Sequence, residues 1–163
     1  EGMFDGDIPF ITPGDLDNNT EETQRFVTEA GAAEVRTVRA GSTLVCCIGA
    51  TIGKTDRAWK LSAFNQQINA IEWDEQIDDD FGLVCMKQCS SIVVQRGSST
   101  ALPILKKSLF QQIQIPVPPL PLQKEFAARV IEIRAMQSEQ AASRKRMDDL
   151  FQSILHRAFN GEL

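Results

Sequence analysis

Residues 115–133, IPVPPLPLQKEFAARVIEI, mark the point at which the character of the sequence changes. The prolines at 116, 118 and 119 remove backbone donors and bias the residues before them toward extended backbone, so no helix runs through residues 116–119. After Pro121 there is no proline or glycine until Gly161, and apolar residues recur at steps of three and four. Pro121 suits a first helical turn, and Asn160-Gly161 supplies a left-handed stop. The sequence therefore predicts one long amphipathic helix.

This helix is expected to be longer than the domain before it is wide. About 38 helical residues span about 57 Å at about 1.5 Å per residue, which exceeds the width of a domain of about 120 residues. The middle of the helix, residues 137–146, is polar. Its apolar stripe consists of Phe126, Val130, Ile133, Met136, Met147, Leu150, Phe151 and Ile154. Because no other segment has a matching length, we expect the stripe to pair as a coiled coil with another chain or a further segment. A helix folded back on its own domain is the alternative.

The residues before the proline-rich segment, which we call the proline hinge, have the pattern of a strand-rich domain. Residues 1–119 consist of short apolar runs separated by Gly, Pro, Asn and Asp. The runs predict strands at residues 8–11, 43–48, 70–73, 81–86 and 113–117, and residues 21–33 and 104–112 have the composition of short helices. The expected fold class is therefore α+β. A strand-rich domain occupies residues 1–119, and the proline hinge and long helix occupy residues 120–163.

The charge of the chain is unevenly distributed. A formal net charge of -5 is the opposite of the basic footprint of a nucleic-acid binder. Residues 1–80 hold 16 acidic and 6 basic side chains, whereas residues 81–163 hold 6 acidic and 11 basic ones. The acidic groups concentrate at residues 15–22 and 74–80. A locally positive face lined by Arg36, Arg39, Lys54, Arg57 and Lys60 is therefore compatible with the negative total.

Membrane and metal functions find little support in the sequence. No stretch approaches the ~18 consecutive apolar residues of a membrane span, and residues 1–7 lack a basic, apolar targeting pattern, so we expect a cytoplasmic protein. Cys46 and Cys47 are adjacent in an apolar run, and the second pair, Cys85 and Cys89, is too loosely spaced for a structural zinc site. Reduced, buried thiols and no bound metal are expected.

The sequence also lacks a catalytic constellation. Residues 49–55, GATIGKT, follow an apolar run as a phosphate-binding loop would, but three residues rather than four separate the glycines. We favour a tight turn in which the glycines adopt positive φ and Lys54 lies at the tip. The lone His156 has no nucleophile near it in sequence, and the carboxylate run at residues 78–80 is interpreted as a solvated turn. No catalytic residue or cofactor motif is predicted.

Two polar segments are candidates for contact with nucleic acid. Residues 64–69, FNQQIN, are rich in amides, which can pair with an adenine edge. Residues 95–100, QRGSST, combine one guanidinium with hydroxyls and suit a phosphate. Amides equally often bond the local backbone, so by residue type alone we favour a structural role for the first segment.

Taken in order, several stretches resemble the specificity subunits of type I restriction-modification systems. They are Gly6 to Ile11 with Gly14 to Leu16, the turn Gly49 to Lys54, Asn65 to Ile68, Ile115 to Leu120, Gln123-Lys124, and the ending Leu155 to Leu163. The likeness covers nearly the whole chain. Leu122 departs from the family, which commonly has an acidic residue before the hinge glutamine. One recognition domain stands where full-length members usually have two, so a fragment or a half-subunit is expected.

The resemblance implies a non-catalytic protein that works within a larger complex. The recognition domain would read one half of a split double-stranded DNA target, and the helix would act as a spacer and dock methyltransferase subunits. A second recognition domain, on another segment or a second copy, would pair through this helix. S-adenosylmethionine, ATP and Mg would reside on the methyltransferase and restriction/translocase subunits.

The resemblance also separates framework residues from residues that choose the target. Motifs shared among relatives that read different sequences cannot select bases, so the Lys54 turn and residues 65–67 take scaffold or phosphate roles. The residues expected to face DNA are Arg36, Arg39, Lys54, Arg57, Lys60 and Arg96. The alternative function is an assembly scaffold with little DNA affinity of its own.

Overall fold

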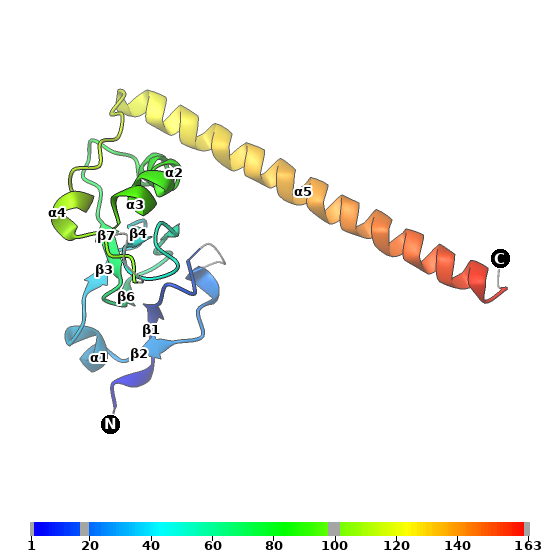
Figure 1. The fold of residues 1–163 in the computed structure, drawn as a ribbon, viewed down its shortest axis with the longest axis horizontal. Helices are drawn as coiled ribbons and strands as arrows, with labels where there is room; N and C mark the ends of the chain where they lie inside the picture. Colours follow the sequence, from blue (N-terminus) through cyan, green and yellow to red (C-terminus); the bar gives the residue numbers. More distant parts are fainter. Residues whose placement is uncertain (1, 17–19, 98–101, 162–163) are drawn as a thin grey trace. The chain divides into compact units, whose positions relative to one another are not determined.

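The computed structural model describes residues 2–16, 20–97 and 102–161, and contacts divide the chain into two units, Glu1–Lys124 and Glu125–Leu163. Figure 1 shows strands and short helices in the first unit, and the second unit as part of one continuous helix. The α+β class and the long C-terminal helix predicted from the sequence are confirmed. None of the described helices is long and apolar enough to cross a membrane.

Seven strands form two sheets among the described residues of the first unit. The four-stranded sheet has the order β2-β1-β6-β3 and comprises β1 (Phe4–Ile11), β2 (Phe26–Val27), β3 (Thr37–Val38) and β6 (Ser62–Phe64). Its β1 and β6 run parallel, and the other two pairs are antiparallel. The antiparallel three-stranded sheet has the order β5-β4-β7 and comprises β4 (Thr43–Cys46), β5 (Thr55–Arg57) and β7 (Ile68–Ile71).

Short helices complete this unit. They are the 3-10 helix η1 (Thr20–Glu22), α1 (Glu29–Ala33), α2 (Asp79–Gln88), α3 (Ser90–Arg96) and α4 (Lys107–Phe110). The helix predicted over residues 21–33 is therefore wrong in part, because this segment divides into η1, the short strand β2 and α1. The prediction over residues 104–112 holds only for its middle, α4.

Strand β4 is buried on both faces, which explains its unbroken apolar sequence. Successive side chains of a strand point to opposite sides. Leu44 and Cys46 accordingly belong to one core cluster, with Leu16, Phe64 and Ile68 among its members. On the other side, Val45 and Cys47 belong to a second cluster, with Met86, Val93 and Phe110 among its members. The four side chains of residues 44–47 are at most 2% exposed, so β4 connects the sheets to α2, α3 and α4.

Residues 81–86 form the middle of α2, and the strand predicted there is wrong. The side chain of Asp78 caps the helix by accepting hydrogen bonds from the backbone nitrogens of Asp80 and Phe81, each at 3.1 Å. Most of the following residues are buried, including Leu83 and Met86. An element buried on most sides has no clear apolar period, so periodicity could not separate a strand from a helix here.

The strand predicted at residues 113–117 is also wrong. This segment has no regular hydrogen-bonded structure, because Pro116 and Pro118 have no backbone donors. Ile113 and Ile115 nevertheless pack against the second core cluster. The expected strand at residues 70–73 is present but displaced toward the N-terminus, since β7 ends at Ile71.

Helix α5 (Leu120–Phe159) is the long helix predicted from the sequence. Pro121 lies in its first turn, and Gly161 has a φ of +70°, as the predicted left-handed stop requires. The first turn is held by Gln123, which is fully buried. Its Oε1 accepts a hydrogen bond from the backbone nitrogen of Asp78 at 2.9 Å, and its Nε2 donates to the carbonyls of Gln76 at 2.9 Å and Pro118 at 2.7 Å. The side-chain amide of Gln123 thus anchors the start of α5. Leu122, at the position where the family commonly has an acidic residue, provides no carboxylate for this.

Candidate nucleic-acid interface

The segment from Gly49 to Lys54 is a tight turn between β4 and β5, as predicted. Gly49 and Gly53 have φ values of +96° and +91°, which side chains rarely tolerate. The backbone nitrogen of Cys46 donates to the Lys54 carbonyl at 2.8 Å, and the Gly53 nitrogen donates to the Cys46 carbonyl at 2.9 Å. Lys54 lies where the chain enters β5 and is half-buried, rather than at the tip.

The amide segment supports this turn. Asn65 Oδ1 accepts a hydrogen bond from the backbone nitrogen of Gln67 at 2.8 Å. Gln67 Nε2 donates to the Ile48 carbonyl at 3.3 Å, and the Gln67 carbonyl accepts from the Cys47 nitrogen at 2.8 Å. These two amides bond the local backbone, which is the structural role favoured from the sequence.

Arg39 is held by an acidic residue at the start of α2. Its guanidinium makes two parallel hydrogen bonds to Asp79, at 2.7 and 2.9 Å, and also donates to the carbonyls of Ala40 and Trp73. The hydrogen bond with Asp79 is the main cause that raises the pKa of Arg39. The backbone nitrogen of Arg39 donates to Glu72 at 3.0 Å. A phosphate would have to compete with these contacts for the guanidinium.

The Arg57 guanidinium also makes contacts within the fold, and little of it is exposed to solvent. Its guanidinium pairs with Asp80 on α2, lies 5.0 Å from the centre of the Trp59 ring, and is only 18% exposed. Lys87 on the same helix lies 3.7 Å from Asp56 on β5. The interpretation of residues 78–80 as a solvated turn is therefore wrong: Asp78 caps α2, and Asp79 and Asp80 fasten it to the sheets.

The other cations predicted to face DNA make fewer contacts within the fold. The Lys60 ammonium lies 5.8 Å from the centre of the Phe26 ring. Arg36 and Arg96 are exposed, and within residues 2–16, 20–97 and 102–161 no hydrogen bond or ion pair engages either side chain. Arg96 ends α3. The rest of the predicted polar loop, residues 98–100, lies outside the described residues.

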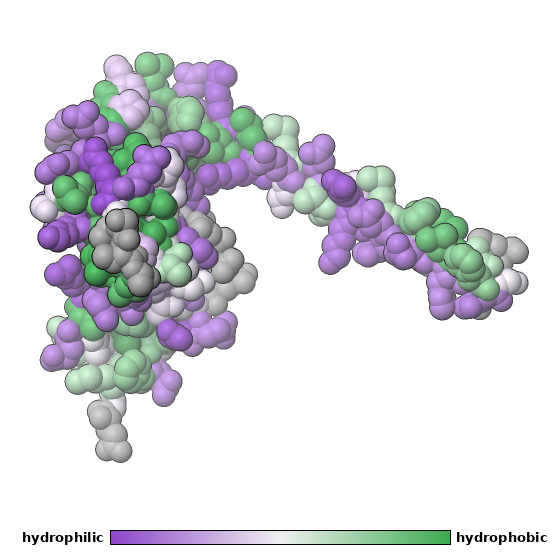
Figure 2. Space-filling view, in the orientation of Figure 1, coloured by the Kyte–Doolittle hydropathy of each residue, from purple (hydrophilic) through white to green (hydrophobic). Residues whose placement is uncertain are grey.

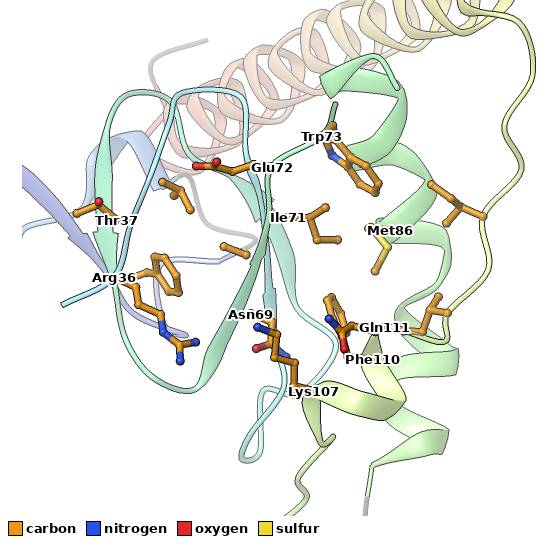
Figure 3. A pocket seen from close by; sticks show the side chains of 15 residues that line it. Arg36, Thr37, Asn69, Ile71, Glu72, Trp73, Met86, Lys107, Phe110 and Gln111 are labelled. Carbon is orange, nitrogen blue, oxygen red and sulfur yellow. The ribbon is translucent and has the colours of Figure 1, made fainter. Parts of the chain in front are cut away.

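A hollow of about 1020 Å³ lies beside Arg36 and also includes residues that the sequence did not single out. It is lined by Arg36, Thr37, Val38, Phe64, Asn69, Ala70, Ile71, Glu72, Trp73, Met86, Lys107, Phe110, Gln111, Ile113 and Ile115 (Figure 3). Of the six cations predicted to face DNA, Arg36 alone lines it. Asn69 belongs to the amide segment 64–69 that the sequence analysis named, whereas Thr37, Glu72, Lys107 and Gln111 are polar lining residues that it missed. No local sequence pattern marks which side chains border a hollow.

The cysteines show no reactive or metal-binding arrangement in the described part of the chain. All four are free thiols, and Cys46, Cys47 and Cys89 are buried. Burial raises the pKa of the Cys47 thiol to about 11, so it remains protonated near neutral pH. Among the described residues no three His, Cys, Asp or Glu side chains gather in a way that could hold a metal ion.

The apolar stripe of α5 is largely exposed to solvent. Seven of its eight predicted members, all except the half-buried Val130, have exposed fractions between 44% and 61%. Figure 2 shows hydrophobic side chains at the surface of the helix, most densely toward its C-terminal end, with a mainly hydrophilic stretch before them. The hydrophilic stretch corresponds to the polar middle of the sequence. Whether the stripe pairs stays a prediction.

Fold and surface together define a class: an α+β domain joined through a proline hinge to one long helix with exposed apolar side chains. The profile of one family, the type I restriction modification DNA specificity domain, matches residues 2–139. The chain belongs to this family. The family is non-catalytic, and catalysis in the type I complex lies in other subunits.

One curated relative and two solved structures are similar to the chain, the structures in their fold. The chain is 29% identical to the type I restriction enzyme HindI specificity subunit of Haemophilus influenzae over 168 residues, which cover 99% of the chain but 36% of that subunit. Its fold is similar to a chain in a structure of the assembly and conformational transition of a type I R-M system, with a TM-score of 0.73, 21% identity, and 98% and 40% of the two chains covered. The HsdS subunit from Thermoanaerobacter tengcongensis gives a TM-score of 0.65 at 20% identity, with 100% and 41% covered. The chain thus spans well under half the length of these relatives.

Proposed function

We propose that this chain recognises one half of a split DNA target for a type I restriction-modification complex and docks methyltransferase subunits through α5. The match to the DNA specificity family over residues 2–139 is the observation that carries the proposal. Two surface features support it: Arg36 and Arg96 on the first unit, whose side chains have no ion pair with the described residues, and the exposed apolar stripe on α5. S-adenosylmethionine, ATP and Mg are assigned to the methyltransferase and restriction/translocase subunits.

The length of α5 suits a spacer between two recognition domains. Its 40 residues span about 60 Å at about 1.5 Å per residue. DNA half-sites one duplex turn apart are separated by about 34 Å, so a pair of such helices is long enough to hold two domains at separated half-sites. The partner in this pairing is a second recognition domain, on another segment of a longer protein or on a second copy of the chain.

Burial of the stripe would provide the energy of pairing. Apolar surface removed from water contributes about 25 cal/mol per Å². The polar centre includes Gln140 and Ser143 at positions that continue the stripe, and polar groups at such positions favour one register over others. Helix pairing with a partner that has the same polar interruption is therefore preferred.

The mass of the chain in solution tests the pairing. Light scattering of a self-paired chain would give twice the monomer mass of 18.1 kDa. Ile133→Glu should reduce the mass to that of the monomer, because a carboxylate would enter the apolar seam. Ile131 is equally exposed but lies about 160° around the helix from Ile133, so Ile131→Glu is the matched control. Equal effects of the two variants would argue against the stripe as the pairing face. A monomeric wild type would restrict the pairing to other partners, such as the methyltransferase subunits.

An assembly scaffold with little DNA affinity is the second candidate, and the charge distribution favours it. The net charge is -5, and two of the predicted DNA-facing arginines, Arg39 and Arg57, are already paired with carboxylates. Titration of the chain with duplex DNA at several salt concentrations separates the candidates. A reader binds with an affinity that falls steeply as salt increases, whereas a scaffold binds methyltransferase subunits but not duplex DNA.

A further inference from the structure

The hollow beside Arg36 has an apolar floor and a polar rim. Met86 and Phe110 are buried members of the second core cluster and belong to the floor. Arg36, Lys107 and Gln111 are exposed members of the lining. Figure 3 shows the polar ends of these three side chains on the side opposite Glu72 and Trp73. The rim therefore offers two cations and one amide to whatever enters from that side.

Both of these cations are free of internal partners. Within the described residues, no hydrogen bond or ion pair engages the side chain of Arg36 or Lys107. The carboxylate in the lining, Glu72, accepts a hydrogen bond from the backbone of Arg39 and interacts electrostatically with the Arg39 guanidinium. A phosphate can thus bind Arg36 or Lys107 without breaking an ion pair, in contrast to Arg39 and Arg57.

The two amide side chains of the lining, Asn69 and Gln111, also differ in whether they have a hydrogen-bond partner among the described residues. Asn69 hydrogen-bonds Cys47 and forms part of the wall. Gln111 follows α4 and is exposed, and its side chain has no hydrogen-bond partner among the described residues. A free glutamine amide offers both a donor and an acceptor, which is the pattern that pairs with an adenine edge.

We propose that this hollow receives one edge of duplex DNA, with Arg36 and Lys107 on phosphates and Gln111 directed to a base. The inference rests on the proposed function and assigns that function to particular residues. Small-molecule sites enclose most of their ligand with a few convergent polar groups. Here the free polar groups lie along an open rim, as an extended polyanion requires.

Neighbouring residues in the sequence provide matched controls. Lys106 and Gln112 are exposed like Lys107 and Gln111 but do not line the hollow. The 163-residue chain is titrated with a pool of duplexes whose central positions are randomised, and bound duplexes are selected and sequenced. Equal urea midpoints for wild type and variants establish that these surface changes leave the fold intact.

Each substitution has its own expected readout. Lys107→Ala or Arg36→Ala removes one phosphate contact, so the slope of log affinity against log salt decreases in magnitude by about 0.9. Over a rise from about 50 to about 200 mM salt, the variant then loses about three- to fourfold less affinity than wild type. Gln111→Ala leaves this slope unchanged but relaxes the selected sequence at one position. Lys106→Ala and Gln112→Ala behave as wild type.

The possible outcomes separate the inference from the proposed function. If the wild type binds duplexes but Lys107→Ala matches Lys106→Ala and Gln111→Ala matches Gln112→Ala, the hollow is not the DNA site, although DNA recognition stands. If the wild type binds no duplex at any salt concentration, both the inference and the DNA-reading function are overturned. Binding of an acidic segment of a methyltransferase subunit that depends on Lys107, without duplex binding, would identify the hollow as a protein-docking site and equally refute the inference.

Discussion

Replacement of Gln123 by alanine should destabilise the first unit strongly, although the residue is a single neutral amide. The side chain is fully buried and makes three hydrogen bonds, which join the hinge carbonyl of Pro118 to the segment that begins α2. At about 1 kcal/mol for each hydrogen bond, Gln123→Ala lowers the free energy of unfolding by about 3 kcal/mol. This is a large part of the 5–15 kcal/mol, roughly, that stabilises a typical domain.

Urea unfolding followed by tryptophan fluorescence measures this loss. Trp59 and Trp73 both lie in the first unit, so the signal is independent of the long helix. With a slope of about 2 kcal/mol per M, the midpoint decreases by about 1.5 M. Gln137→Ala is the control, because Gln137 is exposed on the same helix and its replacement should change stability by less than about 0.5 kcal/mol. Similar midpoints for the two variants would refute the reasoning.

Gln123→Glu tests whether the donor atom matters. The substitution retains an acceptor for the nitrogen of Asp78 but places a carboxylate oxygen against the carbonyls of Gln76 and Pro118. Repulsion and burial raise the pKa of the new carboxyl in the folded state, so the variant regains stability as the pH falls and the proton restores a donor. A urea midpoint for Gln123→Glu that does not change between neutral and acidic pH, relative to wild type, would contradict this assignment.

Three further expectations concern the packing of α2 and the buried thiol. Gly82→Ala should destabilise the domain by about 1–3 kcal/mol in urea unfolding, because an added Cβ would lie 2.3 Å from the Trp73 ring, despite the higher helix propensity of alanine. Asp80→Ala should lower the free energy of unfolding by about 1–3 kcal/mol by leaving Arg57 without its charged partner, and adding Arg57→Met should recover most of this loss. Cys47 should resist iodoacetamide at pH 8 in the native protein but not in urea, as mass spectrometry of the labelled peptides would show. Because its folded-state pKa is raised from 9.0 to about 11, its contribution to stability should decrease as the pH rises through that interval.

The elements predicted correctly from the sequence are those determined by local signals. The prolines before Leu122 and the glycine at 161 mark the ends of α5, and its apolar period is continuous enough to identify a helix. The turn at residues 49–54 was likewise predicted from its two glycines. In contrast, residues 81–86 are buried on most sides, so their sequence carries no period that distinguishes a helix from a strand.

The roles of individual charged residues could not be predicted because their partners are distant in sequence. Arg39 pairs with Asp79, 40 positions away, and Arg57 pairs with Asp80, 23 positions away. In the sequence each was interpreted as a cation of a positive face toward DNA, and residues 74–80 as a separate acidic segment. Lys107 was not predicted to face DNA, because nothing in the sequence distinguishes it from Lys106.

The separation between the framework and the rim of the hollow has a consequence for how such a domain diversifies. The glycine turn is fixed by backbone hydrogen bonds and by the amides of Asn65 and Gln67, none of which involves the free side chains of the rim. Surface substitutions without special contacts usually change stability by less than about 0.5 kcal/mol. Exchange at Arg36, Lys107 or Gln111 is therefore nearly neutral for folding. If the rim contacts DNA as proposed, new target preferences can accumulate one residue at a time, without compensating changes in the core.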